Sequence, residues 1–345
     1  MIVGKYLTKQ LRMSGIDDTT TTEEEAAANA LSCCASCGIA EVDDVKLKQC
    51  DDCDLVRYCG DNCQQQHRPE HEAKCKERAA KLRDEILFRQ PESTHLGDCP
   101  ICFLPLPADQ KNVINSCCSK IICKGCVFAD EIRQCQVKES QRTCPFCRYP
   151  LPKSKEQADK ISMKRVAAND PAALCEYAFD LVKDGDYDGA FKCWSKAAGM
   201  GDASSHFELS IVYRKGQGIE KDEKKEVYHL KEAAIAGHQD ARFNLACHEW
   251  RSGRIEKAVK HWMIAANLGC DDSTQELKEC YKDGSVSKDD FAAALRAHHV
   301  AVKAMKSPQR EAAAKFEASG EIGCPCCAYL KLFPEADANP IDFIP

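Results

Sequence analysis

The sequence predicts a modular fold: two small α+β modules built around clustered cysteines, followed by an all-α solenoid of helical repeats. Three observations support this fold class. Cysteine pairs with short spacings recur between Cys33 and Cys147, a stretch that holds 17 of the 25 cysteines. From about residue 166 the sequence becomes rich in alanine and helical in pattern, and marker glycines recur 36 and 32 residues apart. At 345 residues the chain is also long enough for two or more domains.

The boundaries follow changes in composition. A polar start rich in Thr, Asp and Glu suggests disorder, and the charged run after the first module has helical spacing until Gln90-Pro91. In chain order we predict a disordered N-terminus (1–32), a first cysteine module (33–76), a helical linker (77–95), a second cysteine module (96–152), a linker (153–165), helical repeats (166–302) and a tail (303–345).

Composition also restricts location and partners. The net charge of −6 and pI of about 6.0 give no basic footprint for nucleic acid. The start lacks the apolar core of a signal peptide, and no apolar run is long enough for a membrane span. We therefore expect an intracellular protein, cytoplasmic or nuclear, in a reducing compartment. Clustered cysteines in that setting indicate bound metal rather than disulfides.

The first module has the ligand spacing of two metal sites. Soft thiolates and imidazole in tetrahedral sets select zinc over magnesium or calcium, which prefer oxygen. Cys63, His71 and Cys75 lie four or eight residues apart and so share one helix face, whereas Cys33 lacks the two-residue spacing to Cys37. The predicted ligand pairs are Cys34 and Cys37, Cys50 and Cys53, Cys59 and Cys63, and His71 and Cys75.

These spacings, with Tyr58 and Gln64, resemble the MYND zinc finger, a protein-interaction module that grips short proline-containing peptides. The residue five positions after Cys63 is usually Trp in that family and part of the peptide groove. Here it is Arg68, which removes a large apolar contact. The resemblance implies two cross-braced zinc sites: one holds Cys34, Cys37, Cys59 and Cys63, and the other holds Cys50, Cys53, His71 and Cys75.

The second module resembles a RING finger, which is also cross-braced. The resemblance assigns the first zinc to Cys99, Cys102, Cys123 and Cys126, and the second to Cys118, Cys144 and Cys147. The position that normally supplies the fourth ligand of the second ion is Lys120, whose ammonium has no lone pair. Cys117 is our replacement candidate, with Cys135 behind it. The remaining alternative is a second site that is empty or three-coordinate.

RING fingers act as ubiquitin ligases by holding a ubiquitin-conjugating enzyme and its ubiquitin in a reactive pose, without covalent chemistry of their own. Three residues match the family's partner contacts. Ile101 is the apolar contact in the first loop, Pro145 belongs to the second loop, and Arg148 directly follows the last ligand. An always-charged, forked guanidinium suits the bridging role at that position. The resemblance thus implies a zinc-dependent interaction protein that is a candidate ubiquitin ligase; the alternative is a non-enzymatic adaptor.

The alanine-rich region repeats. Gly201, Gly237 and Gly269 each follow an Ala pair and lie seven residues after Trp194, Leu230 and Trp262, while Leu209, Leu245 and Leu277 follow eight residues later. These residues resemble the Sel-one-like repeat, a relative of the tetratricopeptide repeat, and imply three repeats with degenerate flanks from Pro171 and to His299. Such arrays bind proteins, so we expect the repeats to recruit substrate.

Other catalytic classes find no support. The Cys-x2-Cys pairs lack the βαβ setting of a thioredoxin-like site, and Gly216-Gln217-Gly218 lies in a repeat loop rather than after a strand. No further catalytic domain follows residue 153. Cys324, Cys326 and Cys327 have no second ligand pair nearby, so we expect them to lie in a flexible tail.

Overall fold

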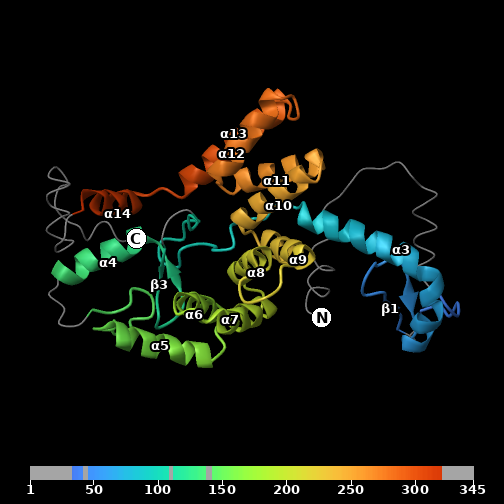
Figure 1. Cartoon of the computed structure of the whole chain (residues 1–345), viewed down its shortest axis with the longest axis horizontal. Helices are drawn as coiled ribbons and strands as arrows, with labels where there is room; N and C mark the ends of the chain where they lie inside the picture. The colour runs from blue at the N-terminus through green and yellow to red at the C-terminus, as the bar shows by residue number, and fades with distance from the viewer. Residues whose placement is uncertain (1–32, 42–45, 109–111, 137–141, 321–345) are drawn as a thin grey trace. The chain divides into compact units, whose positions relative to one another are not determined.

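The computed structural model of the chain describes residues 33–41, 46–108, 112–136 and 142–320 (Figure 1). The chain divides into two compact units, residues 1–87 and residues 88–345. The first unit holds the first cysteine module, and the second holds the second cysteine module together with the repeats. The predicted fold class, two small cysteine-rich modules followed by a helical-repeat solenoid, is confirmed. Cys324, Cys326 and Cys327 lie outside the described residues.

The first unit is a two-stranded sheet followed by one long helix. Strands β1 (Lys48–Gln49) and β2 (Arg57–Tyr58) are antiparallel, with Lys48 opposite Tyr58. Its core is small: Tyr58 and three cysteine side chains are buried, with few apolar residues around them. A core of this size stabilises little by burial alone, so the cysteines must contribute through metal.

Helix α3 (Asp61–Leu87) begins within the first module and includes most of the predicted linker helix. It continues through Pro69, which cannot donate a backbone hydrogen bond. Ligand-type residues on both sides of the proline, Cys63 and His71, anchor the helix to the rest of the module. Its later turns carry exposed i,i+4 ion pairs, Lys76 with Glu72 and Lys81 with Glu77, which are typical of a solvated helix.

The second cysteine module consists of a hairpin and a helix. Strands β3 (Val113–Ile114) and β4 (Ile121–Ile122) pair antiparallel, and helix α4 (Lys124–Gln136) follows directly. Leu106 and Ile122 form its core together with three buried cysteines. Two cysteines, Cys117 and Cys118, lie in the turn of the hairpin, and two others, Cys123 and Cys126, lie at the start of α4.

The repeats form successive pairs of helices. Asp side chains cap several N-termini by accepting a backbone N–H, as Asp170, Asp202 and Asp222 do. The helices are α5 (Lys155–Ala167), α6 (Pro171–Lys183), α7 (Tyr187–Gly199), α8 (Ala203–Lys215), α9 (Glu223–Ile235), α10 (Gln239–Arg251), α11 (Ile255–Asn267), α12 (Asp271–Lys282), α13 (Lys288–Ala304) and α14 (Pro308–Ser319).

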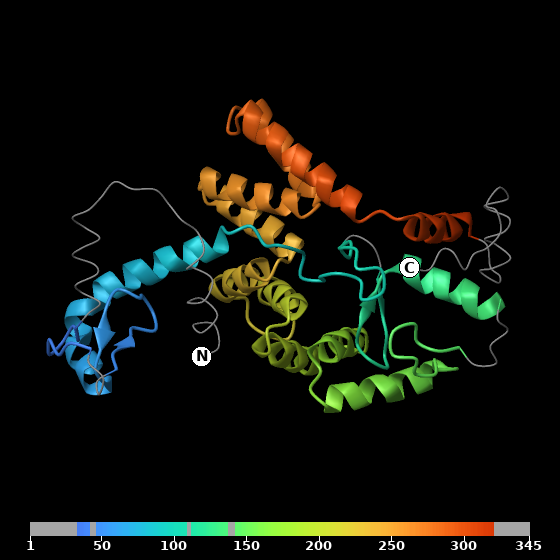
Figure 2. The ribbon, with the colours of Figure 1, turned by 180° about the vertical axis from the view of Figure 1, so that it is seen from behind.

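The repeat pattern read from the sequence corresponds to the packing. Gly201, Gly237 and Gly269 follow α7, α9 and α11 with φ between 89° and 93°, the left-handed conformation that ends each pair. The paired alanines and the large apolar residues before them are buried. The small alanines let neighbouring helices cross closely, and the large residues fill the space between the helices. Figure 2 shows the pairs from behind as one continuous array.

The segment after α3 does not continue as a helix but runs along the repeats in an irregular conformation. Phe88 lies against His261 with the rings tilted and their centroids 4.6 Å apart, and His95 stacks on His238 at 4.0 Å. The His95 N–H donates to the Gly237 carbonyl at 3.1 Å. Helix α3 thus ends at Leu87, shortly before the Gln90-Pro91 end that the sequence predicts. The rest of the predicted linker (77–95) follows a non-helical path, because Pro91 and the contacts with α10 and α11 favour it.

The C-terminal part also differs from the prediction. Helix α5 covers residues 155–167 and so most of the predicted linker (153–165), and helix α14 covers residues 308–319, within the predicted tail (303–345). Both helices start at a Ser cap, Ser154 or Ser307, which is a helix start signal in the sequence. Within the described part of the chain, no helix combines the length and apolar character needed to cross a membrane.

Candidate metal centres

Four groups of ligand-type side chains occur in the described residues, two in each cysteine module. In each group, the four candidate ligand atoms lie within 4.8 Å of one another. Sulfur atoms at this spacing fit the corners of a tetrahedron around one ion with Zn–S distances of about 2.3 Å. The donor chemistry and the spacing both fit zinc. The groups are Cys34, Cys37, Cys59 and Cys63; Cys50, Cys53, His71 and Cys75; Cys99, Cys102, Cys123 and Cys126; and Cys117, Cys118, Cys144 and Cys147.

The groups of the first module interleave along the chain, as cross-bracing requires. The pair at 34 and 37 joins the pair at 59 and 63, while the pair at 50 and 53 joins the ligands at 71 and 75. Cys50 and Cys53 lie in the turn between β1 and β2, Cys59 directly follows β2, and α3 carries the later ligand-type residues. Each ion would therefore tie the hairpin to the helix.

His71 presents a nitrogen to its group. Its Nε2 lies 3.1 Å from the Cys53 Sγ, and the side chain is buried. Burial, together with the nearby His67 and Lys74, lowers the pKa of His71. The imidazole is therefore neutral at physiological pH, which is the form that ligates a metal.

His67 is not a ligand, but it is more than a surface residue. Its ring stacks on His71 at a centroid distance of 5.6 Å, and its Nδ1 lies 3.0 Å from the Tyr58 hydroxyl, itself buried. Tyr58 and His67 thus form an outer layer that restricts the ring of His71. Such outer contacts commonly fix the orientation of a metal ligand. The i,i+4 spacing of the two histidines was the sequence signal for this contact.

Two groups in the second module have the same interleaved order. The Sγ atoms of Cys99 and Cys126 lie 3.8 Å apart, as do those of Cys102 and Cys123. In the other group, the Cys117 Sγ lies 3.4 Å from that of Cys147. The structure places Cys117 in this group, whereas Cys135 lies outside it, near Arg142.

Lys120 is exposed and supplies no ligand atom. Its backbone carbonyl instead accepts hydrogen bonds from the N–H and the side-chain amide of Asn115. These bonds close the β3–β4 turn tightly, which brings the adjacent Cys117 and Cys118 to the same group.

The thiols within each group influence one another's ionisation. Burial acts to raise the pKa of Cys34, but backbone N–H groups outweigh it and the value falls to about 6. Hydrogen bonding with Cys63, Cys37 and Cys34 raises the pKa of Cys59 to about 12. One thiolate thus forms readily, while its neighbours resist ionisation next to it. A divalent cation removes this conflict, so the groups are suited to metal and metal binding releases protons.

Backbone geometry repeats at these groups. The residue directly after a candidate ligand has a positive φ at Asp54 (58°), Phe103 (56°), Ser119 (53°) and Arg148 (62°). In each case its N–H donates to the carbonyl four residues earlier, closing a compact loop. L-residues avoid this conformation at a cost of about 1–2 kcal/mol. This conformation could not be predicted from the sequence, because glycine occupies the equivalent position only at Gly38.

The predicted partner residues Ile101, Pro145 and Arg148 line one groove of about 270 Å³ in the second module. Ile101 comes from the first cysteine loop, and the other two come from the last. Helix α4 adds Ala129 and Arg133. Residues that are 44 positions apart in sequence therefore face the same space.

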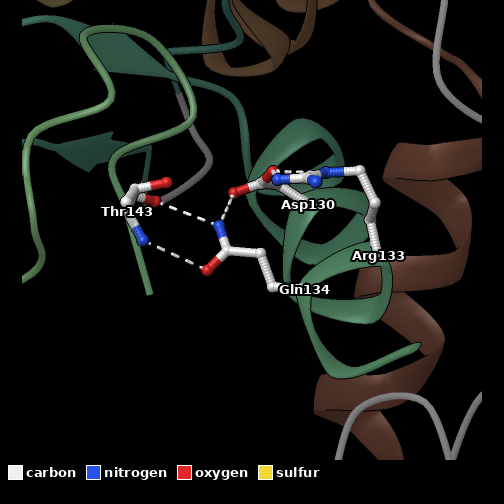
Figure 3. A network of polar contacts seen from close by, with 4 residues as sticks. All are labelled: Asp130, Arg133, Gln134 and Thr143. Carbon is white, nitrogen blue, oxygen red and sulfur yellow. Dashed lines mark hydrogen bonds and ion pairs between the residues drawn. The ribbon is translucent and has the colours of Figure 1, made fainter. Parts of the chain in front are cut away.

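A polar network fixes α4 against the last cysteine loop (Figure 3). The buried Gln134 side chain donates to the Thr143 carbonyl at 3.0 Å and accepts from the Thr143 N–H at 3.2 Å. It also donates to Asp130, whose carboxylate accepts from Arg133 at 3.0 Å. Because Thr143 precedes the candidate ligand Cys144, the network joins α4, which lines the groove, to the second metal group. The sequence pattern did not reveal it.

The first module has a groove of its own, of about 410 Å³, beside α3. Arg68 lines it, together with charged residues of both signs, including Asp52, Glu72 and Lys76. Where the MYND family usually places an indole, this groove is lined by polar groups.

Parts of the chain are similar to known proteins. Residues 34–75 match the MYND finger family, whereas no curated protein matches the chain. A Sel1 repeat protein from Oxalobacter formigenes is similar at 27% identity and a TM-score of 0.38, covering 45% of this chain and 66% of that one. Another is c5321, a protective antigen of uropathogenic Escherichia coli strains that displays an SLR fold, at 18% identity and a TM-score of 0.35, covering 50% and 38%. The chain spans less than two thirds of either structure. It contains a MYND finger at 34–75 and resembles Sel1 repeat proteins.

Proposed function

We propose that this zinc-binding interaction protein acts as a RING-type ubiquitin ligase whose repeats recruit the substrate. The supporting observation is the groove between the two cysteine loops and α4, where Ile101, Pro145 and Arg148 come together. These are the residues that the RING resemblance assigns to the conjugating enzyme and ubiquitin. Their convergence is what a shared partner surface requires.

The proposed mechanism is positioning rather than chemistry on a protein side chain. Zinc, when bound, supplies structural cross-links and no reactive group. Ile101 offers an apolar contact to the conjugating enzyme, and the exposed Arg148 guanidinium donates to the enzyme and ubiquitin together. Holding the thioester in one orientation lowers the entropic barrier to attack by a lysine.

We assign the metal ligands by the same geometry. Each of the four groups would hold one zinc, and Cys117 would complete the second site of the RING-like module. The backbone turn that joins Cys117 and Cys118 supports this assignment over one that uses Cys135.

The test is ubiquitin chain formation by the full chain with a panel of conjugating enzymes. Arg148→Gly should reduce chain formation strongly, since it removes the guanidinium while glycine readily adopts φ of 62°. Arg148→Ala should give the same loss, and Ile101→Ala should weaken capture of the enzyme. Lys120→Ala, which changes an exposed cation outside the groove, is the control and should retain activity.

The alternative function is a non-enzymatic adaptor, and the same assay distinguishes it. Wild-type protein that carries all four zinc ions yet forms no chains with any enzyme tested would favour the adaptor. Equal activity of wild type and Arg148→Gly would also contradict the proposed role of the guanidinium.

A further inference from the structure

Helix α14 packs on the RING-like module, although more than 150 residues separate them. Phe128 and Ile132 of α4 form a buried cluster with Ala312, Ala313 and Phe316 of α14. The Phe128 and Phe316 rings lie 5.2 Å apart, and Lys124 pairs with Glu317 at 2.5 Å. This contact joins the C-terminal end of the described chain to the helix that bears a metal ligand.

The approach of the two helices is close at one point. A Cβ at Gly125 would lie 2.6 Å from the Arg310 backbone nitrogen, which is inside contact distance. Only glycine allows the start of α14 to lie against the start of α4. Gly125 lies between Cys123 and Cys126, so the contact is next to the first metal group of the module.

Arg310 fastens α14 to that group. Its side chain is buried, and its guanidinium donates to the carbonyls of Pro105 (2.7 Å), Leu104 (3.1 Å) and Met305 (2.6 Å). It also lies 3.6 Å from the Cys102 Sγ. A buried cation needs negative partners, and four thiolates around one zinc ion leave a net negative charge. Arg310 therefore has the position of an outer contact to the metal site.

The first turn of α14 then reaches the partner groove. Ser307 and Gln309 line the same groove as Ile101, Pro145 and Arg148. Ser307 caps the helix by accepting the Arg310 N–H at 3.2 Å, so the cap, the groove wall and the metal contact occupy four consecutive residues. A protein seated in the groove would touch α14 as well as the RING-like module.

We propose that α14 is an additional wall of the RING-like groove, held by Arg310, and that Gln309 helps to select which conjugating enzyme the groove accepts. The proposal rests on the ligase function proposed above. Arg310 is a positioning residue: it fixes the zinc loop and the start of α14, while Gln309 contacts the partner.

The first arm of the test uses the full chain and measures zinc release to a chromogenic chelator. Arg310→Ala should release one of the four zinc ions about tenfold faster, because an outer contact is lost. Arg310→Lys should give an intermediate rate, since lysine keeps the positive charge but lacks the several N–H donors of the guanidinium. Arg296→Ala makes the same chemical change on an exposed face of α13 and should match wild type. Equal release from Arg310→Ala and Arg296→Ala would overturn the positioning role.

The second arm measures the affinity of the full chain for each enzyme in a panel. Gln309→Arg should change the order of preference among enzymes at unchanged zinc content. Ala318→Arg adds the same charge to an exposed position of α14 outside the groove and should leave the order unchanged. An unchanged order in Gln309→Arg, with wild type binding normally, would refute the selection role alone. Wild type that binds no enzyme would refute the ligase function as well.

Discussion

At the scale of single residues, the ligand assignment depends on small geometric differences. From the sequence alone, Cys117 is the first replacement candidate for the missing ligand, and Cys135 is the second. The turn closed by Asn115 places the first beside Cys147, while the second lies on α4 and outside the group. Spacing along the chain gives the ligand pairs, but a choice between two single cysteines requires the path of the backbone between them.

This difference yields a test of metal content. Cys117→Ser should lower the zinc content of the purified protein by one ion, since three thiolates hold zinc less firmly than four. Cys135→Ser should leave the content unchanged. Elemental analysis of both variants decides the matter, and a loss of zinc in Cys135→Ser alone would transfer the assignment to that residue.

At the scale of elements, the segment that follows α3 is a structural part of the repeats. Thr94 is buried, Phe88 lies against His261 with Lys257 and Lys260 near its ring, and Gln90 bonds to Asn267 at 3.0 Å. Repeat helices could be predicted because their period is local and regular. The docked segment could not, because it has no period and its contacts reach about 170 residues ahead.

Two glycines of similar conformation allow a matched test of this docking. Gly237 has φ of 89°, and a Cβ there would lie 2.6 Å from the Ser93 carbonyl oxygen. Gly253 has φ of 75° with open space around it. In both alanine variants, the left-handed backbone conformation lowers the free energy of unfolding by about 1–2 kcal/mol. In Gly237→Ala, overpacking against the docked segment should lower the free energy of unfolding by a further amount on the order of 1–3 kcal/mol.

Thermal unfolding and hydrogen exchange provide the measurements. The His95 amide, which donates to the Gly237 carbonyl, should exchange faster in Gly237→Ala than in Gly253→Ala. Similar unfolding midpoints and similar exchange in the two variants would show that the segment does not dock as described.

At the scale of the whole molecule, stability comes from two sources. The cysteine modules have cores of a few residues and depend on metal, whereas the repeats are held by buried alanine, leucine and tryptophan seams that contain none of the four metal groups. This division could be predicted from composition. The packing of α14 on α4 could not, because its small apolar cluster and the close approach at Gly125 follow no recognisable spacing.

Chelation should separate the two sources. The purified chain should carry four zinc ions, and their removal should unfold residues 33–147 while most of the helical circular dichroism persists. Each structural zinc contributes about 10 kcal/mol or more of apparent binding energy near pH 7. Elemental analysis that finds two ions or fewer, or a complete loss of helical signal with chelator, would contradict this division.

The RING-like module meets the repeats twice: the segment around His95 lies on Gly237 and His238, and α14 leads back from α13 onto α4. A ligase with its two working parts on a flexible tether can modify any lysine within the length of that tether. Under the ligase function proposed above, a substrate held by the repeats would be presented at a fixed distance and angle to the thioester. The choice of lysine would then depend on where it lies on the folded substrate, and lengthening the loop between α13 and α14 would broaden that choice.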